Sequence, residues 1–165
     1  MGLIINDKIQ MLMKGYPTVS DKYNVAGATL TGTTPVNFGD VVKFSDTEGY
    51  FEAGTGMTDV SEVAGFVVAT NVKLSRTWPG EVAQTYPGEA FNLLVNGFIA
   101  VELGSDAVVA NIKANAAVAI NLTTGALTTS GVASTSDLPN VVFTGTYENH
   151  GTNDTPRYFA EIYVK

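Results

Sequence analysis

The fold of this chain is decided by residues 93–103, where the sequence reads Leu93-Leu94-Val95-Asn96-Gly97-Phe98-Ile99-Ala100-Val101-Glu102-Leu103. Every second position from Leu93 to Leu103 is apolar or glycine. A period of two places these odd positions on one face of a β-strand, and we expect that face to point towards a core. Gly97 in the middle of the strand predicts a bend or bulge, as a barrel or a curved sheet requires.

Short strands joined by turns are predicted on both sides of this stretch. From Val25 onward Gly, Thr, Asn and Pro recur every few residues, which is typical of strand-rich proteins. The sequence therefore predicts an all-β fold. Further strands are expected at residues 36–44, 49–53, 63–71, 141–147 and 158–164, with a hairpin turn at 121–127 and a Ser/Thr loop at 132–140. In the last strand one face holds Tyr158, Ala160, Ile162 and Val164.

Residues 106–120 allow two interpretations. The segment is rich in Ala and lacks Gly and Pro, so its intrinsic propensity permits a helix. Five β-branched residues favour strands instead, and Asn115 tolerates the left-handed conformation of a turn. We therefore favour strand–turn–strand over helix for this segment. The β-branched residues are Val108, Val109, Ile112, Val118 and Ile120.

Residues 1–24 differ from the rest of the chain. They are nearly neutral, their apolar side chains follow no strict period, and they contain the turn signal Gly15-Tyr16-Pro17. We interpret them as an extended N-terminal arm, ordered by contact with the body or with another chain, and residues 25–165 as a single β-rich domain. The candidate partner-binding residues of the arm are Ile4, Ile5, Ile9, Met11, Met13 and Tyr16.

The composition excludes several classes of protein. The 165 residues carry a net charge of −7, and an acidic chain gains no affinity by releasing counterions from a phosphate backbone, so no nucleic acid partner is expected. The absence of cysteine excludes disulfides and thiolate zinc sites. No apolar run approaches the ~20 residues that span a bilayer, and no signal peptide is visible. We expect a soluble protein made in a cytosol, without a membrane partner.

No catalytic motif emerges from the sequence. The single histidine, His150, lies in a Gly/Asn/Thr loop without a Gly-x-Ser-x-Gly elbow to support a triad. Residues 54–59 begin like a dinucleotide loop but lack its third glycine, and the acidic residues 46–52 lack the spacing of a calcium loop. We therefore expect a protein that is not an enzyme, with no cofactor and no metal ion.

Aromatic-Pro-Gly-Glu occurs twice, at residues 78–81 and 86–89. Pro followed by Gly suits a type II turn, so the pair brackets either a short strand at 82–85 or an exposed loop. Trp78 and Tyr86 are therefore candidate exposed aromatic contacts. Three roles remain open for them: anchors at a protein interface, a platform for sugar stacking, or a cover over the end of a barrel.

Four segments together resemble a known family. They are Phe38-Gly39-Asp40-Val41-Val42-Lys43-Phe44, Val63-Ala64-Gly65-Phe66-Val67-Val68, the Pro-Gly turn and long strand at 86–101, and Ala117-Val118-Ala119-Ile120-Asn121-Leu122-Thr123-Thr124-Gly125-Ala126-Leu127. Over residues 36–165 this pattern is similar to the structural cement proteins that decorate tailed-phage heads. The chain departs from it at Ala114-Asn115, where the family tends to place Gly.

This resemblance implies a small β-barrel or β-tulip-like body and a role in capsid decoration on the outer face of the head. The implied partners are the major capsid protein and other copies of the chain, assembled as a homotrimer. Three alternatives stay open: a virion-surface fibre or glycan-binding module that uses Trp78 and Tyr86, a tail or baseplate component, and a small trimeric nucleotide hydrolase. The motifs that the last would need are not found in the sequence.

Overall fold

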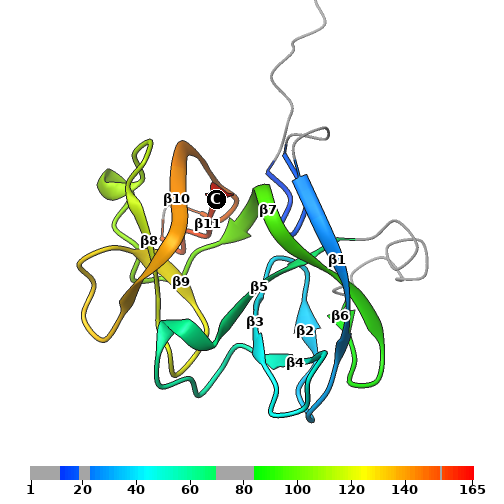
Figure 1. Ribbon diagram of the computed structural model, residues 1–165. Coiled ribbons are helices and arrows are strands. Elements are labelled where there is room, and N and C mark those ends of the chain that lie inside the picture. The colour runs from blue at the N-terminus through cyan, green and yellow to red at the C-terminus, as the bar shows by residue number, and fades with distance from the viewer. Residues whose placement is uncertain (1–11, 19–22, 70–83, 153) are drawn as a thin grey trace, which may run out of the picture.

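The structure is a computed structural model that describes residues 12–18, 23–69, 84–152 and 154–165 (Figure 1). Within these ranges the chain forms β-strands and two short 3-10 turns, so the expected all-β class is confirmed. No helix in the described ranges has the length and apolar character needed to cross a membrane. The strands are β1 (Tyr23–Leu30), β2 (Val36–Asn37), β3 (Val41–Phe44), β4 (Tyr50–Ala53), β5 (Val63–Val68), β6 (Gln84–Thr85), β7 (Ala90–Glu102), β8 (Ala117–Ile120), β9 (Leu127–Thr129), β10 (Ser136–Asn149) and β11 (Tyr158–Val164), and the turns are η1 (Val60–Glu62) and η2 (Val109–Asn111).

Nine strands form one mixed sheet in the order β1-β4-β3-β5-β7-β11-β10-β8-β9. An additional pairing of β1 with β7 closes β1, β4, β3, β5 and β7 into a ring, which we call the first ring. Within it β1 is antiparallel to β7 but parallel to β4, where Thr29 lies opposite Tyr50. The two-stranded sheet of β2 and β6 is separate from this large sheet.

The long strand β7 also belongs to a second group of strands (Figure 1). Its C-terminal half pairs with β11, and the order continues through β10 and β8 to β9. An isolated bridge from Leu103 to Leu127 brings the end of β7 back to β9, and the Gly104 N–H donates to the Leu127 carbonyl at 2.7 Å. We call this partly closed group the second ring, and β7 is the strand that the two rings share.

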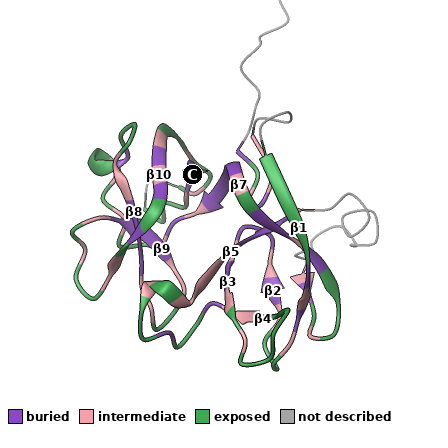
Figure 2. Ribbon diagram, viewed as in Figure 1, coloured by how far each residue is buried: buried purple, intermediate pink, exposed green. Residues whose placement is uncertain are grey.

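Two large cores correspond to the two rings. The core of the first ring contains Ala28, Leu30, Val36, Phe38, Val42, Val67, Phe91 and Leu93. The core of the second ring extends to the outer face of β3 and β5, so that consecutive residues such as Val41 and Val42 lie in different cores. Figure 2 shows the buried residues along these shared strands. Burial on both faces explains why β5 reads as an almost continuous apolar run.

The long strand contains a bulge, as predicted, but the bulge is at Val95 and not at Gly97, which pairs with Tyr23. The register between β1 and β7 shifts between Asn24 and Val25, because Val95 is an extra residue on β7. The alternation of faces is therefore reversed at this point, and the expectation that Val95 faces a core is wrong, since it is 54% exposed. Beyond the bulge Ile99 and its alternate neighbours face the core of the second ring, as predicted.

Several predicted boundaries also need correction. Residues 36–44 form two short strands instead of one, because Gly39 adopts a φ of +78° in the turn between them. Residues 63–71 form a strand only as far as Val68, and residues 70–71 lie outside the described residues. The predicted loop at 132–140 is too long, because β10 begins at Ser136 and buries Leu138. Of the short strand considered at 82–85, the structure describes only Gln84 and Thr85, which form β6.

Residues 106–120 are neither a helix nor two strands. The left-handed turn at Asn115 is confirmed by its φ of 65°, and the strand after it is β8. The first predicted strand is wrong, since η2 occupies its place. The Val108 N–H there donates to the Thr129 hydroxyl at 3.0 Å, and the segment follows the edge of β9 without pairing to it as a strand.

The last strand and the hairpin follow the prediction. In β11 the side chains of Ala160, Ile162 and Val164 are buried on one face, and Tyr158 packs against the same core. The hairpin between β8 and β9 is closed by the Asn121 N–H, which donates to the Ala126 carbonyl at 2.9 Å.

Candidate interaction surface

Residues 12–18, which we call the docked segment, lie along the C-terminal half of β7. The Gly15 N–H donates to the Ala100 carbonyl at 2.7 Å, and the Ala100 N–H donates to the Tyr16 carbonyl at 3.1 Å. Pro17 forms an antiparallel bridge with Ile99. Because β11 occupies the other edge of this half of β7, the docked segment continues the edge that β1 occupies further along. The last described part of the N-terminal region is thus fixed to the body.

Leu12 is the anchor at the start of the docked segment. Its side chain is 5% exposed and packs in a small cluster with Ala100 and Phe159. Its N–H donates to Glu148 Oε2 at 2.8 Å, and His150 Nε2 lies 2.8 Å from the same oxygen. The hydrogen bond with His150, followed by that from the Leu12 backbone, holds the pKa of Glu148 below its usual range. Leu12 is therefore held at a defined place beside β10.

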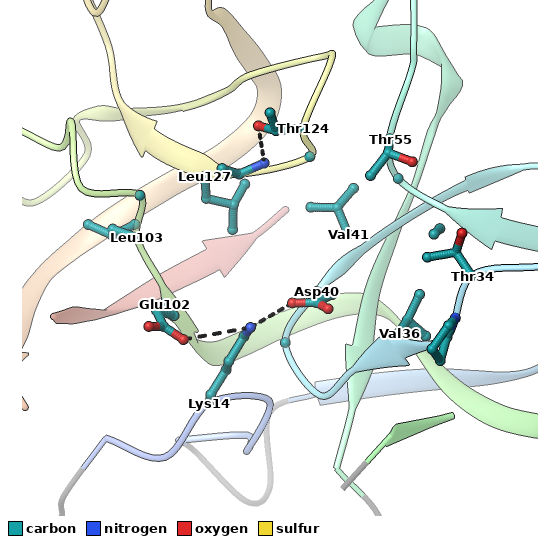
Figure 3. Close-up of a pocket in the computed structure, with 17 residues that line it drawn as sticks. Lys14, Thr34, Val36, Asp40, Val41, Thr55, Glu102, Leu103, Thr124 and Leu127 are labelled. Atoms are coloured by element: carbon teal, nitrogen blue, oxygen red, sulfur yellow. Dashed lines mark hydrogen bonds and ion pairs between the residues drawn. The ribbon is translucent and has the colours of Figure 1, made fainter. Parts of the chain in front are cut away.

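Lys14 fixes the middle of the docked segment at the floor of a pocket (Figure 3). Its Nζ lies 2.6 Å from Asp40 Oδ1 and 3.8 Å from Glu102 Oε2. Glu102 also forms an ion pair with Arg157, whose guanidinium lies 2.8 Å from Glu102 Oε1. Both carboxylates of the pocket are thus paired with cations. This arrangement fixes the position of the docked segment against the body.

The pocket itself has a volume of about 360 Å³ and lies between the two rings. Figure 3 shows Thr34, Thr55 and Thr124 around it, with Val41 and Leu127 at its centre. Among the described residues, no group of three histidine or acidic side chains is placed to hold a metal ion.

The predicted partner-binding residues are only partly described. Met13 is 53% exposed, whereas Tyr16 is half-buried, and burial raises the pKa of its phenol. Both belong to the docked segment. The remaining arm candidates, Ile4, Ile5, Ile9 and Met11, lie outside the described residues, as does Trp78.

Tyr86 is exposed at the end of the first ring, together with two aromatic residues that sequence reasoning missed. Phe44, Tyr50 and Tyr86 are 58%, 44% and 55% exposed. The turn that carries Tyr86 is held against β1 by the Leu30 N–H, which donates to the Glu89 carbonyl at 3.0 Å. Figure 2 shows exposed residues at this lower end of the molecule. No local signal identified Phe44, because a strand-end aromatic residue reads like a core residue.

A third feature missed from the sequence is an uncharged face on β1 and β7. Tyr23, Val25 and Val95 meet at the bulge, and their exposed fractions are 37%, 41% and 54%. No charged residue occurs in β1, and none occurs in β7 before Glu102. We call this surface the uncharged face. It could not be found from periodicity, since the alternation assigned Val95 to the core.

Comparison with known proteins identifies the group to which these features belong. A family model described as "Structural cement protein (E217 gp24/Pam3 gp6)" matches residues 5–157. A chain from a solved structure entitled "The capsid of Myoviridae Phage XM1" superposes with a TM-score of 0.60 and 17% identity, over 97% of this chain and 96% of that chain. At this identity the superposition shows a shared fold. No curated protein sequence matches the chain.

Proposed function

Because the chain belongs to the phage structural cement protein family, we propose that it binds the major capsid protein on the outer face of the head as a homotrimer. It is a capsid cement protein of the virion surface, and its family is structural, without enzymatic activity. The proposal adds the oligomeric state, the shell protein contacted and the residues that make the contact.

The observation that carries this proposal is the anchoring of the docked segment. Leu12 and Lys14 fix the chain to the body, so the point to which residues 1–11 are tethered is defined. Those residues supply Ile4, Ile5, Ile9 and Met11, and the exposed Met13 lies beside their start. We assign capsid or neighbouring-subunit contact to these residues and to Tyr16. An apolar segment tethered to a folded body suits a groove between subunits or addition to a strand.

On a capsid shell, weak contacts of this kind can add up to a high overall affinity. A head presents many identical sites, and a trimer engages several of them at once, which multiplies the affinity of each arm. A protein that binds only the folded, expanded shell stabilises it by mass action. Strong single contacts are therefore not required of the arm.

The body is proposed to be a small β-barrel or β-tulip, with residues 1–24 as the arm and 25–165 as the domain. Closure of the first ring through the β1–β7 pairing, and the apolar core within that ring, support this description. Tyr86 and Trp78 are proposed as additional exposed aromatic contacts. The exposure of Tyr86 beside Phe44 and Tyr50 supports this role for Tyr86.

The test is a truncation that spares the docked segment. Deleting residues 2–11 leaves Leu12 and Lys14 in place, so the body is expected to keep the circular dichroism spectrum of the wild-type β fold while binding to heads that lack the protein is lost. The full-length variant Ile4→Asn/Ile5→Asn/Ile9→Asn separates the effect of side chains from that of length and is expected to bind as poorly. Val108→Ser is a control for loss of an exposed apolar residue elsewhere, since Val108 is 47% exposed. Undiminished head binding by both arm variants would show that the arm carries no affinity.

A further inference from the structure

One edge of β1 lacks a partner strand in the described part of the chain. Along its whole length β1 pairs with β7, but β4 pairs with the other edge only at Thr29 and Leu30. From Tyr23 to Gly27 all residues are exposed. An edge of this kind presents unpaired N–H and C=O groups, and it is a template for pairing with another chain.

The composition of β1 offers no protection against such pairing. Proteins usually guard an open edge with lysine, proline or an inward-pointing charge, and Tyr23–Leu30 contains none of these. Tyr23 and Val25 are exposed on this uncharged strand. In a chain with a net charge of −7, an uncharged face is where two copies can approach without repulsion between their charges.

The direction of the chain indicates which segment reaches this edge. The docked segment and β1 follow the same edge of β7, with Gly15 at Ala100 and Tyr23 at Gly97. The chain therefore runs from Leu12 towards β1, and Leu12 lies at the end of this run that is far from β1, where its N–H donates to Glu148. An arm that covered its own β1 would have to reverse its direction at this anchor.

The arm of a second copy meets no such obstacle. Fully extended, residues 1–11 reach roughly 35–40 Å. Their uncharged start, Leu3-Ile4-Ile5, carries two β-branched residues that favour an extended strand. A strand donated from each copy to the next is a heterologous contact, and such a contact closes when the ring of copies is complete.

We propose that the edge of β1 from Tyr23 to Ala28 receives residues 1–11 of a second copy of this chain as an added strand. The inference rests on the proposed function, in which the arm is a partner-binding segment, and it names the neighbouring subunit as the partner. Main-chain hydrogen bonds to β1 supply the pairing, and the exposed side chains of Tyr23 and Val25 supply apolar contact.

The absence of cysteine permits a direct test by crosslinking. Ile4→Cys and Val25→Cys are co-expressed as two differently tagged chains, purified together and oxidised. A covalent pair of twice 17.4 kDa carrying both tags is expected in most of the material. The matched control pairs Ile4→Cys with Phe44→Cys, since Phe44 is at least as exposed as Val25 but lies at the far end of the first ring. Neighbouring cysteines at residues 3 and 5 cover a shift of register.

Mass measurement in solution provides the second arm of the test. The wild-type protein is expected at three times 17.4 kDa, and both Val25→Lys and the deletion of residues 2–11 are expected to shift it to 17.4 kDa, while Phe44→Lys leaves it unchanged. Three results overturn the inference: a monomeric wild type, an intact trimer in the deletion variant, or crosslinking of Ile4→Cys with Val25→Cys that does not exceed that of the control pair. A deletion variant that stays trimeric but no longer binds heads would leave the proposed function standing.

Discussion

Leu93 and Leu94 are consecutive residues of β7, yet their side chains are buried in two different cores. Leu93 packs with Phe91 inside the first ring, and Leu94 packs with Phe66 in the core of the second. Both are almost fully buried, at 6% and 1% exposure. The first half of β7 therefore separates the two cores, and the residue that follows it, Val95, is pushed to the surface by the bulge.

This relationship predicts an unusual pattern of stability along three neighbouring positions. Leu93→Ala and Leu94→Ala should each lower the free energy of unfolding by ~2–5 kcal/mol, because each leaves a cavity in a core. Val95→Ala should change it by less than about 0.5 kcal/mol, since the side chain is largely in solvent. Urea denaturation of the three variants measures these differences. A large loss at Val95 would contradict the position of the bulge.

The comparison of these positions shows what the sequence could predict. The period of two predicted the strand β7 and the core-facing side chains between Gly97 and Leu103. The glycine at position 97 indicated that the strand would be irregular. The exact position of the bulge depends on pairing with Val25, some seventy residues away in the chain. Local periodicity contains no information about that pairing, so Val95 was assigned to the wrong face.

The same limit applied to the prediction of the candidate site. Features of the local sequence could be recognised, but contacts with distant strands could not. The unusual composition of residues 1–24 was sufficient to nominate Met13 and Tyr16 as contact residues. It could not show that Leu12 would be buried against Phe159, or that Lys14 would pair with Asp40 and Glu102, because these partners come from distant strands. The exposure of Val25 and Phe44 is likewise a result of which strands lie beside them.

Gly125 is expected to be essential for joining the two rings. It has a φ of +75°, and a Cβ at this position would collide with the Gly54 carbonyl oxygen. Gly49 has a φ of +81° with nothing within 4 Å of such a Cβ. Gly49→Ala should therefore cost only the left-handed strain of about 1–2 kcal/mol, while Gly125→Ala should cost at least ~3 kcal/mol through strain and the clash together. Equal thermal melting of the two variants would count against this close approach.

The docked segment offers a second matched pair. Leu12→Ala removes a buried side chain from its contact with Ala100 and Phe159, whereas Met13→Ala removes one that is 53% exposed. We expect about 2 kcal/mol of lost stability from the first and less than about 0.5 kcal/mol from the second. Hydrogen exchange of the Gly15 amide, which is bonded to Ala100, should accelerate only in Leu12→Ala. Unchanged exchange there would mean that Leu12 does not hold the segment.

Acid should loosen the same anchor through Glu148. Hydrogen bonds from His150 and Leu12 lower the pKa of this carboxyl from its usual 4.5, so the folded state favours the ionised form. The stability that it contributes is present above pH 4.5 and is lost as the pH falls through the lowered value. The difference in unfolding free energy between wild type and Glu148→Gln should therefore shrink as the pH falls below 4.5. A difference that persists down to about pH 2, well below the usual range of glutamate, would exclude this carboxylate as the titrating anchor.

The number of copies on the particle should follow the lattice of the head. A cement protein occupies equivalent positions on the shell, and its individually weak contacts become effective because symmetry repeats them. Quantitative mass spectrometry of purified particles should therefore find a ratio to the major capsid protein near one to one, or a fixed simple fraction of it. Particles that carry the arm deletion should show that ratio fall towards zero while the shell protein stays constant. A few copies per particle would instead indicate a fibre or tail component, since those structures occupy a few unique positions and gain nothing from the repeated lattice.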